Sequence, residues 1–122
     1  KRIFLLFAVL VLGAAQTNPS RVTWAAISTV ATTAQLAVPG NDVHTISWVV
    51  TGSPVSCTMH LDGSLTGASW ADLSGNQTCT SNTNAMFHVV DRGVSYVRAN
   101  VTALSGGATI TISYLGHSTG AK

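Results

Sequence analysis

The amino-acid sequence predicts an all-β domain, folded as an antiparallel two-sheet sandwich of jelly-roll type with about eight strands. Clusters of Gly, Pro, Asn, Asp and Ser recur at short intervals along the chain, with no long helical window between them. Three of the intervening segments alternate apolar and polar residues, as strands with one buried face do. The 122 residues, 46% apolar and 8% charged, suffice for one domain with a core.

The first predicted element is an apolar leader, residues 1–15, which precedes the sandwich. Lys1 and Arg2 come before an apolar run, and Gly13-Ala14-Ala15 ends it. A positive start, a short apolar core and small residues at the cut are the parts of a secretory signal. The run is shorter than the roughly 18–20 residues that span a bilayer. We predict cleavage after Ala15 and a linker at 16–20. The alternative is a retained apolar N-terminal helix, and only then would a membrane be a partner.

The β-sandwich is predicted over residues 21–116, followed by a flexible tail at 117–122. Gly106-Gly107 predicts a tight hairpin between the last two strands, and Asp62-Gly63 predicts a turn. The expected strands are Arg21–Ser28, Ala31–Val38, Val43–Thr51, Ser56–Leu61, Ser69–Leu73, Asn84–Val90, Val94–Ala103 and Ala108–Leu115. The alternation places on single faces His44, Ile46, Trp48 and Val50; then Val97, Ala99, Val101 and Ala103; then Ile110, Ile112 and Tyr114. The residues expected to matter most for the fold are Trp48, Trp70, Cys57 and Cys79, with Tyr96, Val97, Val101, Ile110 and Ile112 in the core and Trp70 at the edge of the sandwich.

The two cysteines, Cys57 and Cys79, are the only ones in the chain. An even number after an export signal predicts one disulfide, which would stabilise the fold by about 3 kcal/mol. Two buried free thiols in a reducing compartment are the alternative. Their spacing does not match a zinc motif.

The balance of charged residues indicates whether the domain binds nucleic acid. Outside the leader, four basic residues balance four aspartates, so the domain lacks the electrostatic attraction that drives nucleic-acid binding. We predict no nucleic-acid partner. The basic residues are Arg21, Arg92, Arg98 and Lys122, and the acidic ones are Asp42, Asp62, Asp72 and Asp91.

The inventory of reactive side chains favours a protein without catalytic activity. The chain has no Glu, and Gly63-Ser64-Leu65-Thr66-Gly67 is not followed by the helix that a nucleophile elbow needs. Its four histidines do not form a spaced ligand pair, so no transition-metal site is predicted; a meeting of His60 and His88 across neighbouring strands stays open. No cofactor is expected, with a structural calcium ion at Asp62 and Asp72 as the alternative.

Two stretches carry a family resemblance. Leu61–Leu73, which reads LDGSLTGASWADL, resembles the strand, DGS turn and Trp of galactose-binding-like (discoidin-type) β-sandwiches, and Val94–Thr102 is similar to the YVR strand that follows it there. Together with Gly106-Gly107 and the segment ITISY, they also resemble small sandwich proteins from the structural gene regions of tailed bacteriophages. The resemblance implies a jelly-roll fold and, in the discoidin-type family, ligands held by loops at one end.

The function predicted from these observations is a structural or adhesive surface module, secreted or surface-exposed, or alternatively part of a virion. Low charge, hydroxyl-rich strand faces and many short β edges favour pairing between copies, so we expect a homo-oligomer or larger assembly. The alternative is a carbohydrate-binding module with Trp24 or Trp70 as its aromatic platform. The residues expected to contact a ligand are Asp62, Gly63, Ser64, Trp70, Asp72 and Arg98.

Overall fold

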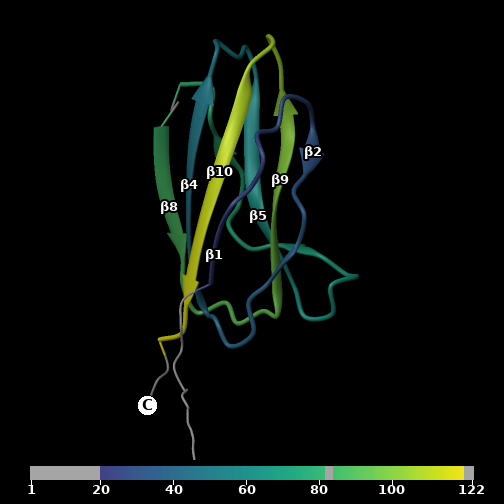
Figure 1. The fold of residues 1–122 in the computed structure, drawn as a ribbon, viewed down its shortest axis with the longest axis vertical. Coiled ribbons are helices and arrows are strands. Elements are labelled where there is room, and N and C mark those ends of the chain that lie inside the picture. The colour runs from purple at the N-terminus through teal and green to yellow at the C-terminus, as the bar shows by residue number, and fades with distance from the viewer. Residues whose placement is uncertain (1–19, 82–83, 120–122) are drawn as a thin grey trace, which may run out of the picture.

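The computed structural model describes residues 20–81 and 84–119, and this part of the chain is entirely β-structure and connecting turns (Figure 1). Within these residues there is no helix with the length and apolar character to cross a membrane. The leader and most of the linker lie outside the described residues. The strands are β1 (Ser20–Thr23), β2 (Ala31–Thr32), β3 (Leu36–Ala37), β4 (Val43–Thr51), β5 (Cys57–Ser64), β6 (Ala71–Asp72), β7 (Gln77–Thr78), β8 (Asn84–Val89), β9 (Tyr96–Leu104) and β10 (Thr109–His117).

The strands form two antiparallel sheets, which confirms the predicted fold class. Sheet A has the order β1-β10-β4-β8, and sheet B has the order β2-β9-β5-β6, with β3 also on β9 and β7 also on β5. The long strands pair over most of their length, since β10 and β4 are in register from Thr109↔Thr51 to His117↔Val43. Sheet A lies nearer the viewer in Figure 1, with sheet B behind it.

The core lies between the two sheets, where the inward faces of β4, β5, β9 and β10 meet. The alternation predicted for the three longest segments is confirmed, because their inward residues are buried apart from Ala103, which is half-buried. One core prediction is wrong. Tyr96 lies on β9 opposite Ser64 and is only half-buried, because its position in the alternation is out of phase with Val97. Trp70, predicted to lie in a strand at the edge of the sandwich, is half-buried in the loop before β6.

The hairpin predicted at Gly106-Gly107 is wrong, because β9 belongs to sheet B and β10 to sheet A. Both glycines adopt the left-handed backbone that the turn requires, with φ of 77° and 70°. The turn therefore carries the chain from one sheet to the other, at the upper end of Figure 1. Two glycines specify a tight reversal, but the pairing is decided by the longer ladders that β9 forms with β5 and β10 with β4.

The turn predicted at Asp62-Gly63 is also wrong, since β5 continues through both residues to Ser64. Asp62 is in register with Arg98, and the attraction between their charges favours extension of the ladder. The chain reverses after Ser64 instead. The Ser64 hydroxyl accepts hydrogen bonds from the backbone N–H groups of Thr66 (3.1 Å) and Gly67 (2.8 Å), and Gly67 has a φ of 83°.

Other predicted strands are shorter than expected. The segment Arg21–Ser28 leaves sheet A after Thr23 and returns only through a bridge from Ile27 to Ile110. Ala31–Val38 is divided into β2 and β3, because the Thr33 hydroxyl accepts from the Ala99 N–H at 2.9 Å in place of a main-chain carbonyl. Ser69–Leu73 contributes only β6, and β7 was not predicted.

The two chain segments after β7 and β10 are fixed by specific bonds. Cys79 follows β7 and forms the predicted disulfide with Cys57 of β5, with a Cα–Cα distance of 4.9 Å. Both cysteines are buried, and because they are bonded to each other, neither is the free thiol of the alternative prediction. At the other end β10 continues to His117, and Thr119 binds the Asp42 carboxylate through its N–H (2.9 Å) and its hydroxyl (2.8 Å). The ordered chain thus extends past the predicted boundary at residue 116.

Candidate functional site

Polar side chains of β5 and β9 gather on the outer face of sheet B. Because Met59 and Leu61 point into the core, the alternation of a strand directs His60 and Asp62 outward. The antiparallel register sets Arg98 opposite Asp62 and Asn100 opposite His60. These four side chains, together with Trp70, are called the Asp62 cluster below.

The Asp62 carboxylate is the centre of this cluster. Its Oδ1 lies 2.8 Å from His60 Nε2, and its Oδ2 accepts from Arg98 Nε at 3.0 Å and from Asn100 Nδ2 at 3.3 Å. The side chain of Asp62 is only 6% exposed, so these donors replace the water that a buried carboxylate loses. The cluster therefore adds side-chain bonds to the main-chain ladder between β5 and β9.

Trp70 covers the cluster from the loop between β5 and β6. The Arg98 guanidinium carbon lies 4.2 Å from the centroid of the Trp70 ring, a cation–π contact. Arg98 is thereby held from two sides, by a carboxylate and by an aromatic ring. This contact fastens the loop, which projects at the right of Figure 1, to the outer face of sheet B.

The ion pair in this cluster predicts a measurable coupling. In a double-mutant cycle with Asp62→Asn and Arg98→Gln, we expect a coupling free energy of about 1.5 kcal/mol, the usual range for a hydrogen bond to a charged group. Chemical denaturation of the four proteins measures it. Asp72→Asn with Arg98→Gln is the control pair and should be additive. A coupling near zero for Asp62 with Arg98 would contradict the assignment.

The structure separates the six predicted contact residues into three groups. Asp62, Trp70 and Arg98 meet in the Asp62 cluster. Gly63 points into the core, and the Ser64 hydroxyl is engaged in the turn after β5. Asp72 is the register partner of Asp62, but its Oδ1 accepts from its own turn, from Ser74 N–H (3.0 Å) and Gly75 N–H (2.9 Å). The role of the six predicted contact residues in ligand binding stays a prediction.

The same geometry bears on two alternatives from the sequence, a metal site and an aromatic platform for carbohydrate. His60 lies in sheet B and His88 in sheet A, so the suggested meeting of these two residues is wrong. No group of three His, Cys, Asp or Glu side chains converges as a metal site within residues 20–81 and 84–119. Trp24 is 7% exposed, which leaves Trp70 as the aromatic platform for the carbohydrate alternative.

His44 is a buried group whose role the sequence did not indicate. It lies on the inner face of β4, as predicted, and is fully buried. Its Nε2 lies 2.7 Å from the main-chain oxygen of Arg92, and its Nδ1 lies 2.7 Å from the Tyr114 hydroxyl. Because a carbonyl only accepts, Nε2 carries the proton and Nδ1 accepts from the tyrosine. Burial lowers the pKa of His44 from its ordinary 6.5 and raises the pKa of Tyr114 to about 12.

A cleft of about 560 Å³ lies between the turn after β5 and the loop from β8 to β9. Leu65, Leu73 and Val94 line it together with Asp91 and Arg92. Leu73 and Val94 pack closely against Gly63 in the lining of this cleft. A Cβ at Gly63 would lie 2.5 Å from Leu73 Cδ1 and 2.9 Å from Val94 Cγ1.

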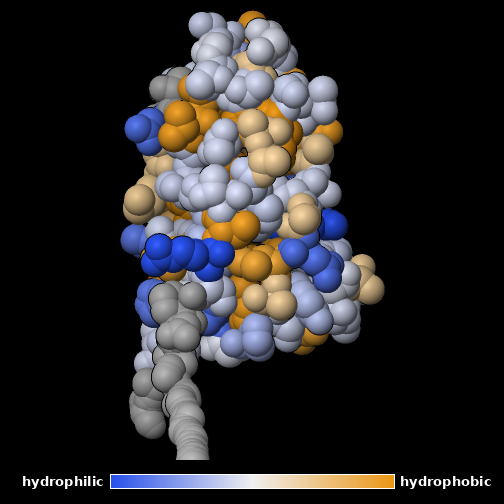
Figure 2. All heavy atoms as spheres, in the orientation of Figure 1, coloured by the Kyte–Doolittle hydropathy of each residue, from blue (hydrophilic) through white to orange (hydrophobic). Residues whose placement is uncertain are grey.

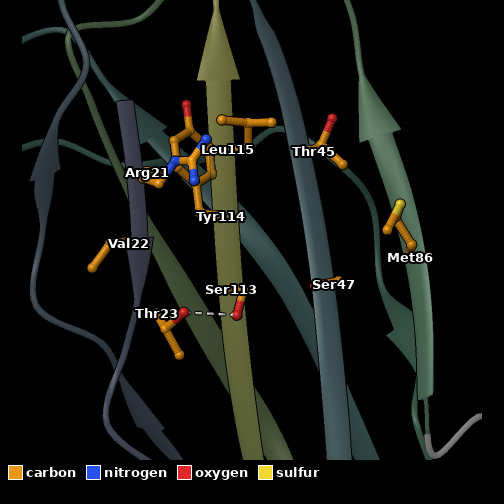
Figure 3. Close-up of a pocket in the computed structure, with 9 residues that line it drawn as sticks. All are labelled: Arg21, Val22, Thr23, Thr45, Ser47, Met86, Ser113, Tyr114 and Leu115. Atoms are coloured by element: carbon orange, nitrogen blue, oxygen red, sulfur yellow. Dashed lines mark hydrogen bonds between the residues drawn. The ribbon is translucent and has the colours of Figure 1, made fainter. Parts of the chain in front are cut away.

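The outer face of sheet A is mostly polar, carries the cationic side chain of Arg21, and has an edge that no described strand covers. Figure 2 shows this face as mostly pale, with separate hydrophobic patches and with strongly hydrophilic residues in its lower half. A shallow depression of about 370 Å³ crosses it, with hydroxyl groups such as Thr23 and Ser113, bonded at 3.0 Å, and with Met86 at the β8 side (Figure 3). On β8, Met86 is 65% exposed. No described strand pairs with the outer edge of β8.

Comparison with solved structures shows which known fold this chain shares. It is similar to the crystal structure of the SPBc2 prophage-derived protein YomS, with a TM-score of 0.64 and 14% identity over 88% of this chain and 99% of that one. It also aligns with a chain described under Bacillus endospore appendages that form a novel family of disulfide-linked pili, with a TM-score of 0.44 and 15% identity over 91% of this chain and 98% of that one. No protein-family model and no curated protein matches the sequence. The chain therefore has a sandwich fold like that of a prophage protein, whereas a discoidin-type fold is not specifically shown.

Proposed function

We propose that this protein is a non-catalytic structural module of a surface or particle, and that its copies associate edge to edge through β8. The observation that carries the proposal is the free edge of β8 in sheet A. Secretion or a place in a virion belongs to the same proposal, which the Cys57–Cys79 disulfide supports, because such bonds persist in oxidising surroundings.

The edge of β8 lacks the devices that normally prevent strands from pairing between molecules. Its sequence NAMFHV contains no Lys and no Pro, and its six consecutive register pairs with β4 contain no bulge. A Lys, a Pro or a β-bulge commonly protects an edge strand from pairing with another molecule. The other strands at sheet edges are shorter, with four residues in β1 and two each in β2, β3, β6 and β7. β8 thus offers the longest unpaired row of main-chain groups in the described chain.

The side chains around β8 favour the same contact. Met86, Val90 and Val49 are 65%, 56% and 49% exposed, and Val49 lies on β4 beside the start of β8. These apolar groups add buried area to the main-chain hydrogen bonds of an added strand. The four acidic and four basic residues outside the leader balance, so repulsion between copies is small.

A single charge on the edge strand tests the proposal. We expect Met86→Lys to weaken self-association at least tenfold, because the ammonium group would be desolvated in the paired edge. The side chain is largely exposed, so the monomer keeps its fold. Sedimentation velocity over a concentration series measures the effect.

The matched control is Thr102→Lys, which adds the same charge on β9 at an exposed position of sheet B. This variant should associate like the unchanged protein. Equal assembly of all three proteins, or a monomer up to about 1 mM, would overturn the proposed function.

A further inference from the structure

The main-chain groups that β8 leaves unpaired belong to alternate residues, and the ladders of sheet A identify which ones. Ile110 of β10 exchanges two hydrogen bonds with Ile27, each of 2.9 Å, so its N–H and C=O point toward the β1 side. Successive residues of an antiparallel strand bond to opposite sides in turn. Thr111, the next residue, therefore bonds toward its register partner Val49 on β4. On β10 the even-numbered residues thus bond toward β1, and the odd-numbered residues bond toward β4.

The same alternation passes from β4 to β8, which lies at the left margin of sheet A in Figure 1. Because Val49 bonds toward β10, its neighbour Trp48 bonds to the other side, toward its register partner Ala85 of β8. The carbonyl of Asp42, also even-numbered, accordingly accepts from the Arg92 N–H just beyond β8. Even-numbered residues of β8 therefore direct their N–H and C=O groups to the edge that no described strand covers. These residues are Asn84, Met86 and His88.

A strand that joins this edge must present its own bonding groups at the same two-residue spacing, and a second β8 does so. When two copies run antiparallel around a two-fold axis at Met86, each Met86 faces the other, and Asn84 faces His88 of the second copy. All three residues bond outward, so each facing pair exchanges two main-chain hydrogen bonds. A register shifted by one residue would set outward-bonding residues against inward-bonding ones. An axis at Phe87 would instead set Asn84 opposite Val90, beyond the end of the strand.

The side chains that meet in this register are compatible in size and charge. On the inner face, Phe87 lies opposite Ala85 of the second copy, so a large side chain meets a small one on both sides of the axis. Phe87 is half-buried, with its ring centroid 5.8 Å from that of Trp48, and the added strand would cover its exposed part. The sequence of β8 contains no Asp, Glu, Lys or Arg, so no fixed charges repel. The second copy thus continues both the ladder and the apolar inner face of sheet A.

The opposite edge of sheet A is a poorer partner for β8. β1 has four residues, whereas β8 has six. Val22 of β1 is the register partner of Tyr114, an even-numbered residue that bonds toward β1, so the outward-bonding residues of β1 are Arg21 and Thr23. The exposed Arg21 would bring a cation to the apolar edge, and a charge on an edge strand opposes pairing. The two edges therefore favour a second β8 over β1.

We infer that β8 pairs with β8 of a second copy around a two-fold axis at Met86, which joins the two A sheets into one continuous sheet. This inference rests on the proposed function, because it specifies the geometry of the edge-to-edge contact. A two-fold contact uses the same edge of both copies and leaves neither free, so it closes at the dimer. A larger particle would then be built from dimers through a different surface.

Cysteine cross-linking tests the position of the axis. Met86→Cys would place two thiols across the axis with about 5.5 Å between their Cα atoms, within the range that a disulfide spans. Met86 is 65% exposed, so the variant keeps its fold. At concentrations where the protein associates, mild oxidation should convert most of it into a covalent dimer without trimers, measured by intact mass. Thr23→Cys, at an exposed position of β1, is the matched control and should stay monomeric by mass.

Opposite charges at position 86 provide an independent test. Met86→Lys alone or Met86→Glu alone would place like charges across the axis, whereas an equimolar mixture of the two variants lets opposite charges face each other. The mixture should therefore associate about tenfold more tightly than either variant by itself. Sedimentation velocity measures the difference. The same pair of changes at Thr102, exposed on sheet B, is the control and should gain nothing from mixing.

The outcomes distinguish this inference from the proposed function. A dimer linked through Met86→Cys, together with tighter association of the mixed charge variants, supports the two-fold pairing. If the protein assembles but either result is missing, the two-fold axis at Met86 is wrong. A link between Met86→Cys and Thr23→Cys in a mixture would then show head-to-tail pairing of β8 with β1, which leaves the proposed function intact. A protein that stays monomeric up to about 1 mM overturns the proposed function and this inference together.

Discussion

Removal of the disulfide, by the double change Cys57→Ala and Cys79→Ala, is expected to lower the free energy of unfolding by about 3 kcal/mol. The bond closes a loop with a sequence separation of 22 residues, and opening it increases the conformational freedom of the unfolded chain. The native contacts offer little replacement, because β7 forms only two register pairs with β5. Urea denaturation with linear extrapolation measures the difference.

Two controls distinguish the effect of losing the disulfide bond from the effect of replacing the two cysteine side chains. The unchanged protein in reductant should lose a similar amount of stability, since it keeps both cysteines in their buried positions. Each single alanine variant should behave like the double variant, because one missing sulfur already removes the bond. A loss below about 1 kcal/mol in reductant would contradict the stabilising role assigned to this bond.

Gly63→Val is expected to lower the free energy of unfolding by about 2–3 kcal/mol, as overpacking of a filled interior does. Gly63 faces the core, and the space that a side chain would need is occupied by Leu73 and Val94. The backbone of Gly63 is part of the β5 ladder with Val97, so the strand cannot move away without loss of hydrogen bonds. Thermal and urea unfolding measure the effect.

A glycine at the molecular surface provides the comparison. Gly93→Ala should change stability by less than about 0.5 kcal/mol, because a Cβ at Gly93 meets no atom within 4 Å. If Gly63→Val were as stable as the unchanged protein, Gly63 would not be the packing position inferred here, and a role in ligand contact would regain support.

The parts of the fold that the sequence predicted are those with a local signal. In β4 and β10, most of the alternate inward residues are apolar, and the register between Trp48 and Ile112 follows once both strands bury that face. The disulfide could likewise be predicted without the fold, because Cys57 and Cys79 are the only cysteines in the chain. By contrast, Gly106-Gly107 specifies a tight turn without specifying whether the two strands pair or pass to opposite sheets. This choice depends on partners far away in sequence.

The candidate sites depended still more on distant contacts. Asp62 and Arg98 were selected separately, but only the β5–β9 register shows that they face each other. The Asp62-Gly63 pair carries the composition of a turn, and the Arg98 partner across the sheet overrides that preference. The role of His44 could not be predicted, because its partner is the main chain of Arg92, which any residue would supply. The edge of β8 is likewise defined by the absence of a neighbouring strand within residues 20–81 and 84–119, which no local pattern encodes.

The most direct test of edge-to-edge association is amide hydrogen exchange along β8 in dilute and concentrated protein at neutral pH. An added strand would bond the outward main-chain groups of β8, so alternate amides between Asn84 and Val89 should gain protection as the concentration rises. Amides of β2 and β6 in sheet B should not change. If β8 exchange is the same at every concentration while the protein assembles, or if protection appears only in sheet B, the proposed interface is wrong.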